Sequence, residues 1–439
     1  MTRRVVVIGG GIGGGAAALR LARAGCAVTV VERGERLGGL VTSFAIGGTP
    51  LECFYHHIFP HEHEIRGLID ELGLGPRLEW RESSVGVFTG GSAWPFTTPA
   101  DLLRFGPLRF RDRLRAGVGA LRMSRVEDWQ RLDGIPATEW LRSYTGAAAA
   151  EVVWDPLLRA KFGPAAATVP AAWMWGRLQQ RSGARSWKGE RLGYLRGGFR
   201  QLFDALAGEL ERLGVEIRVA TSVEHIDVDG SGAVEGVATS TGHLPADAVL
   251  YTGSLRGLLP LVPPSAVDAR WSAIGRLGVL CVVLEVERQA GPFYWTNVCD
   301  PDLPFGGVIE HTNMLPTSDY GCHVVYLSRY FTEDEPIAAA DPATEAARWV
   351  EIFSERWPGV RPGDVTAVHP FRTLEAAPLV MTGHLGRIPP VTAEGVRGLF
   401  VSTTAQIYPQ DRGMSEGVRT GTASADTILA GWEMVGATR

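Results

Sequence analysis

The sequence predicts a two-domain α/β protein, and three observations support this fold class. An apolar run, a glycine-rich turn, a helical run and a second apolar run follow one another over residues 5–31, which is the order of a strand–helix–strand unit. Short apolar strands return at 215–250 and 398–402. Long insertions separate these pieces. We therefore expect a discontinuous first domain, residues 1–80, 191–259 and 391–439, and a second domain made of insertions 81–190 and 260–390.

The glycine turn predicts a site for a dinucleotide. Gly9, Gly11 and Gly14 have G-x-G-x-x-G spacing, which lets the turn tighten, the backbone approach a pyrophosphate and the helix pack closely on the strand. The phosphates would lie at the helix N-terminus, against its free N–H groups. Glu32 ends the second strand, where a carboxylate accepts hydrogen bonds from a ribose hydroxyl. A 2′-phosphate would be repelled there, which disfavours NADP.

The residues after Glu32 distinguish FAD from NAD. Segment 32–39 reads Glu-Arg-Gly-Glu-Arg-Leu-Gly-Gly, which resembles the E-x-x-x-x-x-G-G continuation of the flavin amine oxidase and protoporphyrinogen oxidase superfamily. In that superfamily the paired glycines let the chain pass beside the FAD pyrophosphate, and an arginine at the position of Arg36 lies close to it. The resemblance implies a glutathione-reductase-like Rossmann domain with FAD as a tightly bound prosthetic group.

The remaining elements of the first domain follow in order. Apolar residues at helical spacing predict a helix from about Gln201 to Leu213. Turn residues then separate short strands. In the superfamily that the sequence resembles, the backbone at the position of Val223 pairs with the adenine. The expected strands and the final helix are Val215–Val219, Val223–Val228, Ala233–Thr239, Ala248–Leu250, Gly398–Ser402 and Met414–Ala430.

The segment before the final helix carries Asp411, Arg412 and Gly413. The resemblance implies that this helix points its N-terminus at the flavin and stabilises negative charge on the reduced ring, with Asp411 accepting from a ribityl hydroxyl. The alternative is a solvated turn that caps an ordinary helix. The expected cofactor-binding residues are Gly9, Gly11, Ile12, Gly13, Gly14, Glu32, Arg33, Arg36, Gly38, Gly39, Leu40, Val223, Asp411, Gly413 and Met414.

The two insertions are expected to form a substrate domain of helices and a mixed sheet. The first is mostly helical, and the second has strand-like stretches at Val279–Val286 and Val324–Tyr330. The stretch from Arg104 to Arg122 is rich in arginine, with Asp112 as its one acid among these arginines. Three interpretations of this stretch are open: a solvated face, a site for an anionic substrate and a membrane-surface helix. Interrupting glycines and a proline favour the solvated face.

Three residues are candidates for catalysis. His57 follows a strand expected at residues 40–46, and the resemblance to the superfamily implies that this segment lies near the flavin. His57-Ile58-Phe59 also resembles the G-A-H-I-F segment of UDP-galactopyranose mutase, whose histidine touches the flavin. Tyr55-His56 replace Gly-Ala here. His311 and Lys161 each lie in a short polar stretch of an otherwise apolar part of the sequence. We expect His57 or His311 to act as a base or orienting donor, with a pKa near working pH. Their alternatives are structural histidines and an exposed lysine at a helix end.

Composition excludes several classes of protein. A formal charge of −5 gives no nucleic-acid footprint. Five widely spaced cysteines without C-x-x-C predict neither a disulfide framework nor a zinc site. Clustered histidines at 56, 57, 61 and 63 alternate between faces of an extended segment, so we expect no metal site. No apolar run reaches the length of a membrane span. We expect a cytoplasmic protein without a transmembrane segment; peripheral membrane contact is the disfavoured alternative.

The sequence therefore predicts an FAD-dependent oxidoreductase acting in biosynthetic metabolism. It would oxidise a small or medium organic substrate by hydride transfer to flavin N5. No second G-x-G-x-x-G motif is available for NAD(P)H, so oxygen or a separate carrier is the expected electron acceptor. One alternative is a non-redox sugar mutase of the UDP-galactopyranose mutase type, which uses reduced flavin and binds a nucleotide diphosphate through arginines. The other is a flavin-binding protein without catalysis.

Overall fold

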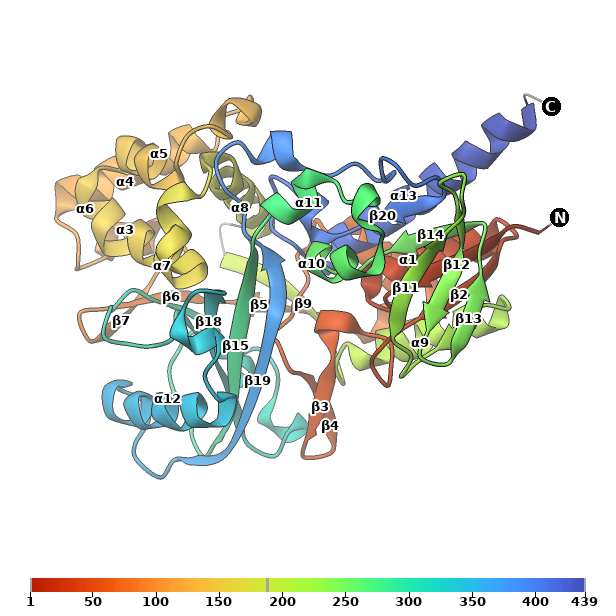
Figure 1. The fold of residues 1–439 in the computed structure, drawn as a ribbon. Helices are drawn as coiled ribbons and strands as arrows, with labels where there is room; N and C mark the ends of the chain where they lie inside the picture. Colours follow the sequence, from red (N-terminus) through yellow and green to blue (C-terminus); the bar gives the residue numbers. More distant parts are fainter. Residues whose placement is uncertain (1, 187–188, 438–439) are drawn as a thin grey trace.

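The first part of the molecule is a parallel sheet whose strands come from separate stretches of the chain. The computed structural model describes residues 2–186 and 189–437, and Figure 1 shows it as a ribbon. Neighbouring strands all run parallel. The chain first adds strands on one side of β1 and later adds strands on its other side, so the strand order reverses beside β1. In such sheets, ligands bind near this point, at the carboxyl ends of the strands. The spatial order is β10 (Glu216–Arg218), β2 (Ala27–Val31), β1 (Arg4–Ile8), β14 (Ala248–Tyr251) and β20 (Leu399–Val401).

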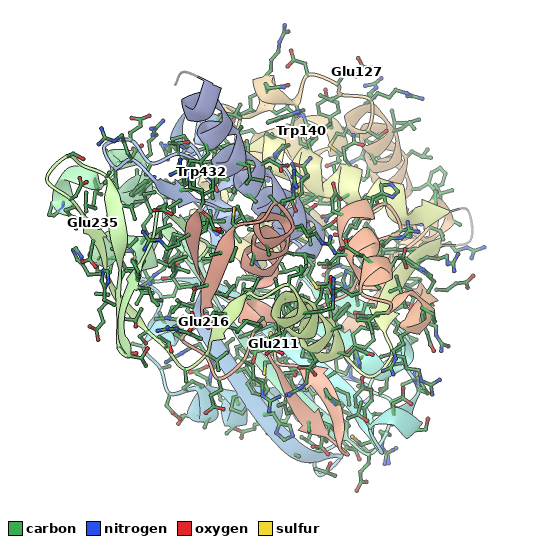
Figure 2. All side chains as sticks on the ribbon, turned by 90° about the vertical axis from the view of Figure 1, so that its right-hand side faces the viewer. Glu127, Trp140, Glu211, Glu216, Glu235 and Trp432 are labelled. Carbon is green, nitrogen blue, oxygen red and sulfur yellow. The ribbon has the colours of Figure 1, made fainter. Side chains whose placement is uncertain are left out.

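Three helices accompany this sheet: α1 (Ile12–Arg23), α9 (Arg200–Arg212) and α13 (Met414–Ala437). Helices α1 and α13 touch through glycine, because a Cβ at Gly421 would lie 2.1 Å from the carbonyl oxygen of Gly13. Near the other end of α13, the guanidinium of Arg3 lies 5.3 Å from the ring centroid of Trp432, which Figure 2 labels. The last helix of the chain is thereby fixed beside the first.

Most elements expected in this part are confirmed within two residues. The meander consists of β11 (Val223–Val228), β12 (Val234–Thr239) and β13 (Gly242–Pro245). The strand expected at residues 40–46 is wrong at its start. Residues 39–41 form a 3₁₀ turn instead, because Gly38 and Gly39 adopt positive φ angles of 148° and 56° that redirect the chain. The hairpin strands β3 (Ser43–Ile46) and β4 (Thr49–Glu52) follow this turn.

A mixed sheet forms the floor of the second part. Its strands β16 and β6 run parallel, and the other neighbours run antiparallel. Helix α12 (Pro342–Arg356) packs its buried Trp349 and Phe353 against this sheet. The spatial order is β19 (Val365–Pro378), β15 (Arg276–Val286), β18 (His323–Thr332), β17 (Gly307–Glu310), β16 (Trp295–Val298), β6 (Val85–Thr89) and β7 (Ser92–Pro95).

Helices from the first insertion form a layer beside the mixed sheet, at the upper left of Figure 1. The chain enters and leaves this insertion through paired strands β5 (Leu78–Ser83) and β9 (Gly189–Leu195). The sequence-based domain boundaries stay a proposal; those at 80/81 and 190/191 fall within these two strands. The helices are α3 (Pro99–Arg104), α4 (Phe110–Met123), α5 (Ala137–Thr145), α6 (Ala147–Ala149), α7 (Asp155–Phe162) and α8 (Ala171–Ala184). The other short elements are α2 (His63–Glu71), β8 (Arg185–Ser186), α10 (Leu255–Leu258) and α11 (Ala269–Ala273).

Within residues 2–186 and 189–437, no helix is both long and apolar enough to cross a bilayer.

A buried carboxyl group ties the two parts together. Glu52, at the end of β4, accepts hydrogen bonds from the Tyr194 hydroxyl at 2.6 Å and from the Phe199 backbone N–H at 2.7 Å. Its own backbone carbonyl accepts from the Tyr326 hydroxyl of β18 at 2.7 Å. Burial raises the pKa of Glu52 to about 7, although both donors act in the opposite direction. The folded protein therefore holds this proton more tightly than the unfolded chain does.

This linkage predicts how Glu52→Gln changes the pH dependence of stability. Raising the pH through the ordinary carboxyl pKa of 4.5 to about 7 ionises Glu52 in the unfolded chain first, which lowers the wild-type free energy of unfolding. A glutamine keeps hydrogen-bonding capacity toward both partners and does not titrate. Relative to wild type, the variant should gain roughly 2–3 kcal/mol between pH 5 and pH 8. Urea unfolding at both pH values measures this, and a constant difference would contradict the assignment.

Candidate active site

A single large cavity joins the two parts of the molecule. Its volume is about 1790 Å³, well above the roughly 300–1,000 Å³ of a pocket for one drug-sized ligand. One end is lined by the glycine turn after β1 and by Glu32, and the other by side chains of α7, α8, β18 and the loop before α13. The cavity is therefore large enough for a dinucleotide and a second molecule beside it.

The three motif glycines have different roles in the turn. Gly9 has φ +107°, and a Cβ at Gly14 would lie 1.9 Å from the carbonyl oxygen of Gly9. These two glycines are required by the protein itself. Gly11 faces the cavity, where an added Cβ would meet only the Cα of Gly39, at 3.9 Å. Gly11 is also the N-cap of α1 and gives no side-chain cap, which leaves N–H groups at the helix start for an anionic ligand.

Glu32 is held in place at the end of β2. Its two carboxylate oxygens accept from the backbone N–H groups of Gly10 and Gly34, each at 2.7 Å. A carboxylate has further lone pairs beyond these two bonds, so it can also accept from a hydroxyl group in the cavity. The open space over Gly11, the helix start and the oriented carboxylate together fit the pyrophosphate and ribose of FAD.

The structure brings the predicted cofactor residues together. Every one of the fifteen lines this cavity: Gly9, Gly11, Ile12, Gly13, Gly14, Glu32, Arg33, Arg36, Gly38, Gly39, Leu40, Val223, Asp411, Gly413 and Met414.

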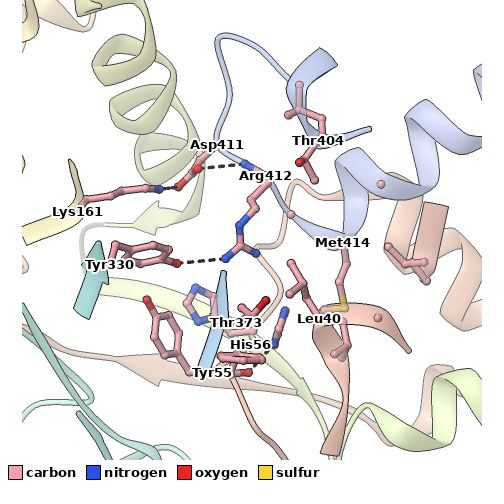
Figure 3. Close-up of a pocket in the computed structure, with 18 of the residues that line it drawn as sticks. Leu40, Tyr55, His56, Lys161, Tyr330, Thr373, Thr404, Asp411, Arg412 and Met414 are labelled. Carbon is pink, nitrogen blue, oxygen red and sulfur yellow. Dashed lines mark hydrogen bonds and ion pairs between the residues drawn. The ribbon is translucent and has the colours of Figure 1, made fainter. Parts of the chain in front are cut away.

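Charged side chains from distant segments meet at the inner end of the cavity, as Figure 3 shows. Asp411 pairs with the Lys161 ammonium of α7 and lies 3.3 Å from the Arg177 guanidinium of α8. Arg412 donates to the Tyr330 hydroxyl of β18 at 3.2 Å. We call Lys161, Arg177, Tyr330, Asp411 and Arg412 the polar cluster. The carboxylate expected to bind a ribityl hydroxyl is thus already engaged by two cations of the protein.

The charges of the polar cluster shift one another. Burial, together with the Arg177 and Arg412 cations, lowers the pKa of Lys161 below its ordinary 10.5, and Asp411 only partly offsets this. Burial alone would raise the pKa of Asp411, but Lys161 and Arg177 hold it far below its usual range. The Lys161 ammonium also lies 4.7 Å from the Trp173 ring centroid. Asp411 therefore stays ionised, while Lys161 loses its proton more readily than a solvated lysine.

His57 lies in the cavity wall, as expected, but its protonation differs from the expectation. Its Nδ1 is 3.3 Å from the Tyr294 hydroxyl, and its ring meets Trp295 edge-on. Burial lowers the pKa of His57 to about 3, assisted by the charges of Arg181 and Arg177 and by His56. The expected pKa near working pH is therefore wrong. His57 is neutral and is suited to orienting a ligand by hydrogen bonding.

His311 does not reach the cavity. It is buried, and its Nε2 lies 2.8 Å from the Tyr320 hydroxyl, with the rings of Tyr194 and Tyr326 around it. Burial lowers its pKa to about 3. The catalytic role predicted for His311 is therefore not supported by its position, and the structural alternative describes it better.

Sequence reasoning missed the partners of Lys161. No sequence pattern singles out Arg177, and Tyr330 was expected only as the last residue of a strand. Arg412 was noticed only as part of the turn before α13. Their common signal is position rather than type, because all three line the cavity through elements far apart in the chain.

Among the clustered histidines, the ring of His61 stacks on that of Phe59, with ring centroids 5.6 Å apart. The described part of the chain holds no group of three His, Cys, Asp or Glu placed to bind a metal.

Comparisons with known proteins show similar sequences and a similar fold. Coproporphyrinogen III oxidase from Propionibacterium freudenreichii is 28% identical over 325 residues, covering 60% of each chain. Putrescine oxidase from Kocuria rosea is 33% identical over 163 residues, covering 34% of this chain and 33% of the oxidase. The chain thus matches about 60% or less of the length of these relatives. A structure of reduced UDP-galactopyranose mutase has a TM-score of 0.77 at 16% identity and covers 98% and 94% of the two chains, which shows a shared fold.

The family comparison covers nearly the whole chain. Residues 12–429 match the family described as flavin containing amine oxidoreductase. This span includes the polar cluster and most of the fifteen predicted cofactor residues. The chain belongs to the flavin-containing amine oxidoreductase family, whose cofactor fits the cavity described above.

Proposed function

We propose that this protein oxidises a small or medium-sized organic substrate that binds between the FAD and the polar cluster. The observation that carries the proposal is the continuity of one cavity from the glycine turn to Lys161 and Asp411. The fifteen cofactor residues named above would hold FAD at the first end. Bound FAD supplies the hydride acceptor. The rest of the cavity would bind and orient the substrate and keep water from it.

The charges at the inner end indicate which substrates fit. Arg177 and Arg412 supply two cationic groups around the single carboxylate of Asp411, and Lys161 adds a third while it is protonated. Arg181 adds a further positive charge close to His57. A substrate amine would be a cation and would meet repulsion here. A carboxylate or phosphate group would gain charge-assisted hydrogen bonds from the guanidinium of Arg177. We therefore favour an acidic substrate over a diamine such as the one named for the putrescine oxidase relative.

Lys161 is the best-placed proton acceptor. Oxidation of a C–H bond next to a hydroxyl or amino group releases a hydride and a proton, so the proton needs a base in the cavity. A lysine with a lowered pKa supplies this base in its neutral form. His57, whose pKa is about 3, is a much weaker base. Lys161 would thus accept the proton, and Arg177 would bind the acidic group of the substrate.

Arg177→Gln tests this substrate class. The holoenzyme is mixed anaerobically with a panel of carboxylate-bearing, phosphate-bearing and amine metabolites, and loss of oxidised flavin absorbance is followed. We expect acidic compounds to reduce the flavin, and Arg177→Gln to raise their KM at least about tenfold with a smaller change in kcat.

The matched control is Arg348→Gln, which removes an exposed arginine of α12 and should behave as wild type. Reduction of the flavin by amines and not by acids would overturn the substrate class while leaving the oxidoreductase itself intact.

A further inference from the structure

Helix α4 exposes its large apolar side chains to solvent. Phe110 is 63% exposed, Leu114 46%, Val118 51% and Leu121 54%. Their spacing of four, four and three residues places them on one side of the helix. We call these four residues the apolar stripe. Leu103 of α3 is also 46% exposed. Contiguous exposed apolar side chains of this size are typical of an interaction surface.

The opposite side of α4 packs on the protein through two small residues and one methionine. Ala116, Gly119 and Met123 are buried. A Cβ at Gly119 would lie 2.4 Å from the carbonyl oxygen of Tyr144, so glycine is required for this close approach. An ordinary surface helix buries its large apolar residues and exposes polar ones. Helix α4 instead exposes its four-residue apolar stripe, which indicates that its outer side contacts something other than water.

Arginines surround the apolar stripe. Arg104, Arg109, Arg111, Arg115, Arg122 and Arg125 are all exposed. Within the described ranges, Arg111 alone of these six has an ion pair, a distant one of 3.8 Å to Asp112. The chain as a whole has a formal charge of −5, so this concentration of positive charge is local. Apolar side chains bordered by arginine complement a bilayer, with acyl chains below anionic headgroups.

The cavity opens beside the apolar stripe. Leu121 is exposed and also lines the cavity, and so do Ala120 and Ser124. Leu102 of α3 contributes to the same part of the wall. A molecule entering at this point would therefore pass the apolar stripe before it reaches the polar cluster.

We propose that α3 and α4 dock on a bilayer that contains anionic lipid. The apolar stripe would lie among the acyl chains, and the arginines would contact the headgroups. Figure 1 shows these helices in the helical layer on the left, away from the meander β11–β13 on the right. A symmetric pairing of two copies is disfavoured, because it would bring the same arginines of both chains together. The cavity mouth would then face lipid, so a substrate with an apolar body could enter from the membrane; this clause rests on the proposed oxidoreductase function.

Vesicle flotation of the FAD-loaded protein tests the docking without using activity. We expect the protein to float with vesicles of phosphatidylcholine and phosphatidylserine, and to float much less with phosphatidylcholine alone or at high salt. Phe110→Ser combined with Val118→Ser should reduce the bound fraction at least about tenfold. Neither residue lines the cavity. The control pair is Val368→Ser and Leu385→Ser, two exposed apolar residues elsewhere.

Each outcome is decisive. Failure of the wild-type protein to float, or equal flotation of both variant pairs, would overturn the proposal. A wild-type dimer in light scattering that becomes a monomer in Phe110→Ser, Val118→Ser would assign the stripe to a second copy of the chain instead. Protein that floats but whose flavin no substrate reduces would preserve the docking and count against the proposed function alone.

Discussion

Gly11→Val should yield a folded protein that retains almost no FAD. Gly11 has φ −71° and ψ 179°, an extended conformation that valine adopts readily. An added Cβ would meet no protein atom closer than the Cα of Gly39 at 3.9 Å, so we expect the variant to fold. The valine side chain would fill the space that we assign to the pyrophosphate. The effect on FAD retention should therefore exceed the effect on folding.

The measurement is the flavin released from purified protein by denaturation, compared with protein concentration. We expect occupancy to fall at least about tenfold, which corresponds to about 1.4 kcal/mol of lost binding free energy or more. Gly67→Ala is the control, because Gly67 lies in α2 with no neighbouring atom within 4 Å of an added Cβ. Wild-type occupancy in Gly11→Val, with circular dichroism unchanged, would show that the cofactor does not bind over this glycine.

The second large effect is expected at Lys161. Lys161→Arg keeps a positive charge beside Asp411 but cannot lose its proton at working pH. If Lys161 accepts the substrate proton, this variant should bind substrate with little change in KM and reduce its flavin about 10²–10⁴-fold more slowly. A role limited to holding Asp411 or attracting an acid would survive this substitution. The two variants Lys161→Arg and Arg177→Gln should thus separate rate from binding.

The pH profile gives an independent signature. The wild-type rate of flavin reduction should rise with pH as Lys161 deprotonates, with its inflection below the ordinary lysine value of 10.5 because burial, Arg177 and Arg412 lower this pKa. Lys161→Met, whose apolar side chain suits the contact with Trp173, should be slow at every pH and lack the rise. A wild-type profile without the rise, or a fast Lys161→Arg variant, would assign the proton to another group.

Local sequence patterns predicted the cofactor cradle well. The turn, helix and strands of residues 4–31 are adjacent in the chain, so glycine spacing and apolar periodicity determine them directly. The same applies to β11 and β12, whose bounds match those expected within one residue, and to the start of α13, which continues to Ala437 beyond the expected end at Ala430. The exception was the segment after Gly38 and Gly39, where two positive φ angles replaced the start of an expected strand. The apolar residues of this segment suggested a strand and gave no sign of the 3₁₀ turn that begins it.

The inner end of the cavity could not be predicted in the same way. The pairing of Lys161 with Asp411 joins residues 250 positions apart, and the position of Arg177 depends on how α8 packs against both. No periodicity within one segment carries this information. The lowered pKa of His57 has the same origin, because burial and the arginines of α8 act on a histidine from another part of the chain. His311 looked polar and available, yet three tyrosines enclose it.

Electron stoichiometry tests the central claim, net oxidation, most directly. With a substrate that bleaches the flavin, the account predicts that each molecule of product is accompanied by one molecule of acceptor reduced, whether oxygen or a dye, and that the oxidised flavin spectrum returns when substrate is exhausted. The alternative sugar mutase would work only after dithionite reduction and consume no acceptor. Isomerisation of a nucleotide sugar by the reduced protein, with its flavin spectrum unchanged throughout, would contradict the account.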